Sequence, residues 1–151
     1  MARRPSNIFQ RGHLRQAYRS GLELAVGAML ASAGIAAEYE TVRVPYEVPA
    51  KTRHYTPDWV LPNGIILETK GLWDSDDRAK HLLIRQQHPD LDIRMVFSNP
   101  NAKLRKGSPT TYAAFCEKHG IKFSKKEPPK EWLTEPACPV KTSAVDKLRK
   151  G

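Results

Sequence analysis

The sequence Pro-Asn-Gly at 62–64 lies between two short segments whose composition is typical of β-strands. These three residues suit a type I turn that Gly64 closes in the left-handed conformation. They predict a β-hairpin built from residues 58–61 and 65–70. Because the length of the loop fixes the register of a hairpin, it also fixes which side chains lie opposite each other.

In this register Asp58 lies directly opposite Glu68. Side chains alternate along a strand, so Lys70 shares their face, together with Val60 and Ile66. The opposite face is wholly apolar and carries Trp59, Leu61, Ile65 and Leu67. The hairpin therefore combines a charged end with a surface that a core can cover.

Two carboxylates that face each other on adjacent strands repel, and a divalent cation between Asp58 and Glu68 would remove that repulsion. Oxygen ligands of this kind suit Mg²⁺. Lys70 could then orient a water molecule or help to stabilise its deprotonated form. An acidic pocket that holds cations among basic surfaces is what hydrolysis of a phosphodiester requires.

A third carboxylate comes from the helix predicted over residues 22–33. Ser20 is typical of an N-cap, Glu23 completes the pattern S-x-x-E, and Gly34 is a plausible C-terminal stop. Glu23 lies at the edge of the apolar stripe of this helix, which consists of Val26, Met29, Leu30 and Ala33. It could therefore present an acid at the border of the core.

The rest of the chain alternates between strand and helix patterns. Residues 45–57 contain Pro45, Pro49 and Pro57, so this stretch should be an extended edge or a connector between two halves, not a central strand. The other predicted elements are a strand at 38–44, a helix at 76–87 capped by Ser75, a strand at 91–98, a helix from Ser108-Pro109 to Gly120, and a strand at 121–124.

Net charge is +9, and most of the basic excess lies at the two ends of the chain. We expect a basic arm at 1–19, one nuclease domain at 20–132 and a basic tail at 133–151, with the ends meeting a polyanion. No segment resembles a recognition helix, so contacts should go to phosphates. The candidate contact residues are Arg11, Arg15, Arg19, Lys103, Arg105 and Lys106.

Several classes of protein are disfavoured. Cys116 and Cys138 lie in no C-x-x-C motif, which argues against a disulfide framework or a zinc knuckle, and Cys116 reads as a buried helix residue. Residues 22–37 imitate a signal peptide, but Glu23 interrupts them and a membrane span needs about 20 apolar residues. We expect a cytoplasmic protein with no membrane association.

The spacing of Pro57-Asp58, nine residues, and Glu68-Thr69-Lys70 is the PD-(D/E)xK nuclease pattern. The pattern is short, and each residue has a simpler explanation. Glu23 could serve only as the capping-box acid, Lys70 could be a solvated strand end, and Asp58 could cap a turn after Pro57. The residues alone leave these alternatives open.

Longer motifs are more specific. The segments SGLE, VPYEVPA, YTPDWVLPNG, ETKGLW, KGSPTTY and FCEKHGIKF, within residues 19–132, resemble the endonuclease I family of phage T-seven. Members of that family are Holliday-junction resolvases. The resemblance implies a mixed α/β fold of the restriction-endonuclease type, in which helices flank a mixed central sheet. It also implies an intertwined, domain-swapped homodimer in which residues 45–57 cross between the two halves.

The same resemblance implies the site. Glu23, Asp58 and Glu68 would be catalytic metal ligands, Lys70 the catalytic lysine, and the backbone carbonyl of Thr69 a further ligand. Each site would be composite, with Glu23 supplied by one chain and the other residues by its partner. We expect Mg²⁺, with Mn²⁺ able to substitute, two ions per site and no small-molecule cofactor.

These observations predict a Mg²⁺-dependent, structure-selective endodeoxyribonuclease that resolves four-way junctions as a homodimer. If it is phage-encoded, it would act in the host cytoplasm. One alternative is a repair or restriction nuclease on the same scaffold. Another is a non-catalytic basic protein that binds branched or single-stranded DNA and uses its carboxylates only for structure.

Overall fold

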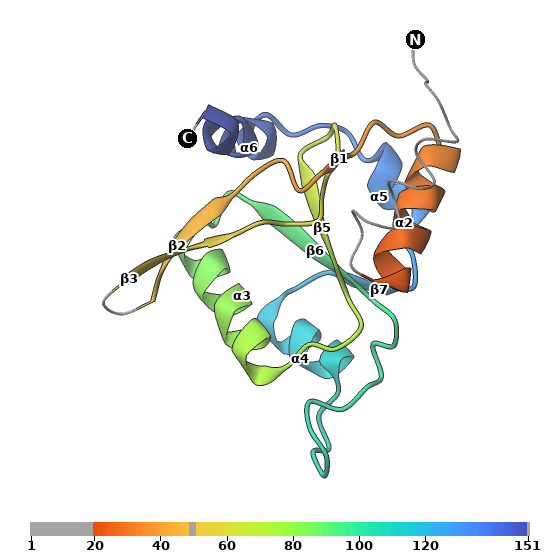
Figure 1. The fold of residues 1–151 in the computed structure, drawn as a ribbon, viewed down its shortest axis with the longest axis vertical. Helices are drawn as coiled ribbons and strands as arrows, with labels where there is room; N and C mark the ends of the chain where they lie inside the picture. Colours follow the sequence, from red (N-terminus) through yellow and green to blue (C-terminus); the bar gives the residue numbers. More distant parts are fainter. Residues whose placement is uncertain (1–19, 49–50, 151) are drawn as a thin grey trace.

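The computed structural model describes residues 20–48 and 51–150. Its centre is a five-stranded sheet with the order β1-β4-β5-β6-β7 (Figure 1). The first two pairings are antiparallel and the last two are parallel, so the sheet is mixed. Its strands are β1 (Glu38–Tyr39), β4 (Trp59–Val60), β5 (Ile65–Lys70), β6 (Asp92–Phe97) and β7 (Phe123–Lys125). The expectation of a mixed α/β fold with flanking helices is confirmed.

The predicted hairpin forms in the predicted register. Trp59 pairs with Leu67, and Val60 pairs with Ile66. The loop closes as expected, because Gly64 has a φ of 92° and its N–H donates to the carbonyl of Leu61 at 3.0 Å. Such a φ favours glycine, so the turn residue and the register support each other.

Helices cover both faces of the sheet. Val60 and Ile66 pack into one apolar cluster with α3 (Ser75–Gln87) and α6 (Pro139–Lys150), and α4 (Tyr112–His119) covers Met95 and Phe97 further along the same face. On the opposite face lie α2 (Gly21–Ser32) and α5 (Lys130–Thr134). These two helices cover the apolar side of the hairpin, formed by Trp59, Leu61, Ile65 and Leu67.

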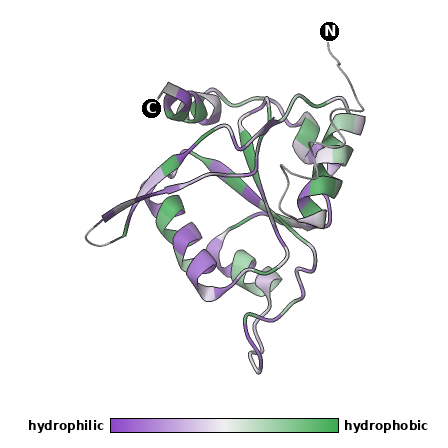
Figure 2. Ribbon diagram, viewed as in Figure 1, coloured by the Kyte–Doolittle hydropathy of each residue, from purple (hydrophilic) through white to green (hydrophobic). Residues whose placement is uncertain are grey.

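The strand predicted at 38–44 is wrong in extent. Strand β1 ends at Tyr39, and Glu40 follows with a φ of 53°, which turns the chain out of the sheet. The chain then forms a separate two-stranded antiparallel hairpin from β2 (Val44–Val48) and β3 (Lys51–Tyr55). Pro45 thus lies in a two-stranded sheet and not in a central strand, and Figure 2 shows the outer part of this hairpin to be hydrophilic.

Helix ends follow the capping residues. Ser20 caps α2 as predicted, accepting the N–H of Glu23 at 3.1 Å. Asp74, not Ser75, caps α3. Helix α4 begins three residues later than predicted because Thr111 provides its cap, and it ends at Gly120, whose φ is 69°. Cys116 is buried on this helix as expected, and no helix in the described part of the chain is long and apolar enough to span a membrane.

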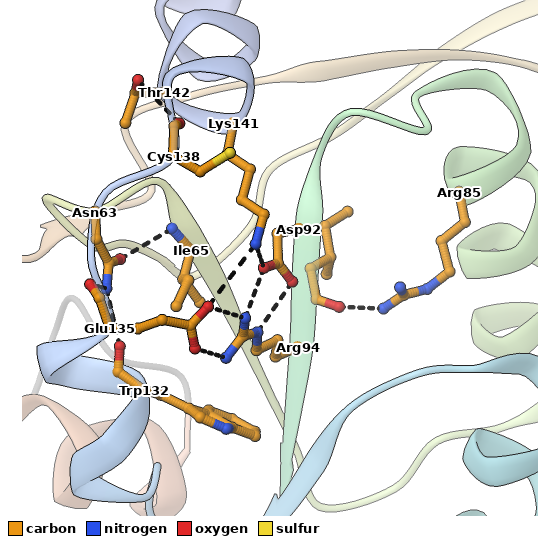
Figure 3. A network of polar contacts seen from close by, with 11 residues as sticks. Asn63, Ile65, Arg85, Asp92, Arg94, Trp132, Glu135, Cys138, Lys141 and Thr142 are labelled. Carbon is orange, nitrogen blue, oxygen red and sulfur yellow. Dashed lines mark hydrogen bonds and ion pairs between the residues drawn. The ribbon is translucent and has the colours of Figure 1, made fainter.

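We expected a basic tail after residue 132, but α6 packs on the sheet, where Val145 is 1% exposed. A polar network holds this segment in place (Figure 3). Arg94 of β6 is 1% exposed and donates to Glu135 at 2.9–3.0 Å and to Asp92 at 2.7–3.0 Å. Lys141 of α6 donates to the same Asp92 at 2.6 Å. Charge pairing across distant segments, which no local pattern reveals, fixes the position of α6.

Arg94→Ala should destabilise the protein strongly, because it leaves the carboxylate of Asp92 half-buried with one partner fewer. The free energy of unfolding should fall by about 3 kcal/mol. Arg149→Ala, which removes a pair that Arg149 makes with Glu38 at the surface, should cost under about 1 kcal/mol. Urea denaturation of the two variants measures both values. Equal losses would contradict the role assigned to the Arg94 network.

Candidate functional site

A cleft of about 570 Å³ opens at the end of the β4–β5 hairpin. Its walls come from α2, the bend after β1, strands β3 and β5, and α3. The residues that line it are Glu23, Glu40, His54, Tyr55, Thr56, Asp58, Glu68, Thr69, Lys70 and Lys80. All five residues predicted for the site, Glu23, Asp58, Glu68, Thr69 and Lys70, thus lie on one cleft.

Asp58 is buried and is held by the strand opposite. Its Oδ2 accepts the backbone N–H of Thr69 at 2.9 Å and the hydroxyl of Thr69 at 2.7 Å. Burial raises the pKa of Asp58 to about 6, although both hydrogen bonds from Thr69 favour the charged form. Asp58 is therefore a fixed carboxylate whose charge is poorly solvated, and not merely a turn cap.

Glu68 is 5% exposed and accepts the hydroxyl of Tyr55 at 2.7 Å through Oε1. Burial, and then the charge of Asp58, raise the pKa of Glu68 to about 8. The repulsion inferred from the hairpin register is therefore present in the folded chain. A positive ion in the cleft would favour the ionised forms of both groups.

Glu23 has two roles. Its backbone N–H donates to the hydroxyl of the N-cap Ser20, as the sequence pattern predicts, and its side chain lies in the cleft. There its Oε2 accepts the hydroxyl of Tyr39 at 2.7 Å. The cap therefore uses the backbone N–H of Glu23, while its carboxylate belongs to the cleft.

Glu40 belongs to the same cluster and was missed by the sequence analysis. One carboxylate oxygen each from Glu23, Glu40 and Asp58 lie within 4.8 Å of one another, whereas Glu68 lines the cleft outside this group. Three carboxylates are a donor set that fits a hard divalent cation. The left-handed φ at Glu40 brings it into the cleft, and nothing in the local sequence signals that bend.

Lys70 projects from the end of β5 into the cleft, with its Nζ 3.4 Å from Asp77 of α3. Both side chains are 23% exposed. An ammonium group at the mouth of an acidic cleft can orient a water molecule or a phosphate oxygen. Lys70 is therefore more than a solvated strand end.

The predicted DNA contacts fall into two sets. Arg11, Arg15 and Arg19 lie outside the described residues. Lys103, Arg105 and Lys106 are exposed on the loop between β6 and α4, which projects from the body of the protein (Figure 1). The loop begins beside the cleft, because the N–H of Ser98 donates to the carbonyl of Lys70 at 3.1 Å.

Comparisons with known proteins agree on one family. The model for "Phage endonuclease I" matches residues 2–151. Endonuclease I of Escherichia phage T7 is 64% identical over 120 residues, which cover 80% of each chain. Endodeoxyribonuclease 1 of Enterobacteria phage T3 is 60% identical over 121 residues, again 80% of each chain.

The raised pKa values of Asp58 and Glu68 predict how stability depends on pH without metal. Unfolded carboxyls titrate near pH 4, so between about pH 4 and 8 these two groups bind more protons in the folded state than in the unfolded state. Their contribution to the free energy of unfolding should therefore fall as pH rises through this window in the presence of chelator. Glu68→Gln should flatten the upper part of the slope, measured by urea denaturation at several pH values.

Glu117→Gln, at an exposed position on α4, is the matched control and should keep the slope of the parent protein. A Glu68→Gln slope that equals the slope of this control would contradict a charge penalty at Glu68.

Proposed function

The chain belongs to the phage endonuclease I family, and from that membership we propose a Mg²⁺-dependent endodeoxyribonuclease selective for branched DNA. Its substrate would be the four-way junction and its reaction the hydrolysis of phosphodiester bonds. The relatives are named as an endonuclease and an endodeoxyribonuclease, which supports DNA cleavage in general. These names state neither selectivity for junctions nor a metal, so both are part of the proposal.

The observation that carries the proposal is the pair of buried carboxylates Asp58 and Glu68, which share one cleft with Glu23 and Lys70. Their raised pKa values mean that ionising these carboxylates is unfavourable in the folded protein. Groups with strongly shifted pKa values concentrate at functional sites. A solely structural role would favour neutral or oppositely charged partners here, so this feature argues against the non-catalytic alternative.

In the proposed mechanism, Glu23, Asp58 and Glu68 would hold the cation, together with the backbone carbonyl of Thr69. Glu40, which lies in one cluster with Glu23 and Asp58, would be a further ligand. A bound Mg²⁺ supplies Lewis-acid stabilisation of the charge that develops on the phosphate. Thr69 fixes the orientation of Asp58 through its N–H and hydroxyl. Lys70 orients the attacking water from the mouth of the cleft and stabilises its deprotonated form.

Substrate binding would depend on phosphates. The loop with Lys103, Arg105 and Lys106 begins next to Lys70, so it can follow a DNA backbone whose scissile bond lies in the cleft. Phosphate contacts position a protein without reading sequence. Recognition of shape rather than bases suits a branched substrate, and binding should weaken steeply with added salt.

We further propose that two chains act together as a domain-swapped homodimer. In a domain swap the same contacts form as in the single chain, but one of the two contacting segments comes from the partner chain. The position that α2 occupies against Trp59, Leu61 and Leu67 would then be taken by α2 of the partner chain. That helix would place its Glu23 in the cleft of the first chain. Two sites related by a two-fold axis suit paired cuts across a symmetric junction.

A junction assay tests the activity. With Mg²⁺ the protein should cut a synthetic four-way junction much faster than a duplex of equal length, and chelator should stop cutting. Glu68→Gln should reduce cleavage at least about 100-fold and leave junction binding intact, because an amide keeps the shape and loses the charge. Gel analysis of products and gel-shift titrations measure the two effects.

Absence of any metal-dependent cutting would overturn both nuclease hypotheses and favour a binding protein. Equal cutting of junction and duplex would overturn junction selectivity and favour a repair or restriction nuclease.

Subunit exchange tests the composite site. Homodimers of Glu23→Ala and of Lys70→Ala should each be inactive. Mixed and exchanged, they should regain nicking, because each hybrid dimer contains one site built from the intact Glu23 of one chain and the intact Lys70 of the other. If Glu23 and Lys70 of one chain form a site together, as the fold of the single chain also permits, the mixture stays inactive.

A further inference from the structure

Three of the carboxylates proposed to bind the cation, Glu23, Asp58 and Glu68, share one feature. In each, one oxygen accepts a short hydrogen bond from a side-chain hydroxyl. Tyr39 donates to Oε2 of Glu23 at 2.7 Å, Tyr55 to Oε1 of Glu68 at 2.7 Å, and Thr69 to Oδ2 of Asp58 at 2.7 Å. Ser20 approaches the other oxygen of Glu23 at a much longer 3.4 Å.

Both tyrosine rings are fixed by neighbouring side chains. The ring of Tyr55 lies 5.1 Å edge-on from the buried ring of His81, and the ammonium of Lys80 lies 5.3 Å from its centroid. The ring of Tyr39 packs on Trp59 with its centroid 4.8 Å away. Each hydroxyl is therefore directed at its carboxylate by the packing of its ring.

Hydrogen bonds of this kind orient metal ligands. A glutamate side chain on an open wall can rotate and can offer a cation one oxygen or both. A hydroxyl that holds one oxygen fixes the rotation and leaves the second oxygen for the ion. Removing such an outer partner lowers metal affinity by about 10-fold to 100-fold in known metal sites.

We propose that Tyr39 and Tyr55 are positioning residues of the cation site. Tyr39 holds Glu23 and Tyr55 holds Glu68, so that each glutamate presents its second oxygen to the ion. The proposal rests on the proposed function only in assuming that a divalent cation binds these carboxylates. The two tyrosines come from β1 and β3, outside the hairpin that carries the PD-(D/E)xK pattern.

The experiment compares Tyr39→Phe, Tyr55→Phe and Tyr46→Phe with the parent protein. Tyr46 is the matched control, because it is a buried tyrosine of β2 that lines a separate groove against α3. Mn²⁺ is titrated into each protein without DNA and followed by calorimetry. The Mg²⁺ concentration that gives half-maximal nicking of a four-way junction is measured in parallel.

We expect Tyr55→Phe and Tyr39→Phe to bind Mn²⁺ about 10-fold to 100-fold more weakly than Tyr46→Phe. Half-saturating Mg²⁺ should rise by a similar factor, and the nicking rate at saturating Mg²⁺ should fall less. Mn²⁺ affinities of both variants within about twofold of the control would overturn the proposal, since 10-fold is the smallest loss expected. If Tyr55→Phe shows no cooperative thermal unfolding, the Mn²⁺ affinity of Tyr39→Phe decides.

Mn²⁺ binding and DNA cutting by the parent protein distinguish a failure of this proposal from a failure of the proposed function. A parent that binds Mn²⁺ but cuts no DNA would overturn the nuclease activity, and the Mn²⁺ titrations would still decide the role of the tyrosines. A parent that cuts with Mg²⁺ while the variants match the control would overturn only the positioning role. A parent that neither binds Mn²⁺ nor cuts would overturn both.

Discussion

The register of the β4–β5 hairpin is the constraint on which the site depends. A slip of the register by one residue would turn every side chain of one strand to the other face of the sheet. Asp58 would then leave the face that carries Glu68. The left-handed Gly64 prevents this slip, since it closes a loop of one length only. In the observed register Val60 and Ile66 enter the core, while Asp58 meets the N–H and hydroxyl of Thr69. Core and site are thus specified together.

The cleft has the opposite character to the scaffold around it. Burial raises the pKa of both Asp58 and Glu68, and nearby carboxylates add to it: Asp58 acts on Glu68, while Glu23 and Glu40 act on Asp58. Ionising these groups therefore costs stability in the absence of a cation. Elsewhere buried charge is compensated, as where Arg94 meets Asp92 and Glu135. The scaffold pairs these charges internally, whereas the cleft gathers carboxylates of like charge within 4.8 Å of one another.

Sequence reasoning succeeded where the controlling interactions are local. The cap at Ser20, the turn at Gly64 and the stop at Gly120 each act within a few residues, so the elements they bound were predicted. It failed at the strand expected over 38–44, which the backbone leaves at Glu40. It also gave no sign that residues 139–150 pack as a helix, because the partners that hold this helix, such as Asp92, lie far away in the chain.

The sequence by itself determined the hairpin, its register and the shared face of Asp58, Glu68 and Lys70, since alternation and turn geometry depend on neighbouring residues alone. Only the tertiary structure decided what surrounds them. Glu40 and Tyr55 reach the cleft from other segments, through a bend and a second hairpin whose positions follow from packing, and Tyr39 of β1 reaches the carboxylate of Glu23. Contacts between distant segments depend on the whole fold, so no local pattern could have indicated them.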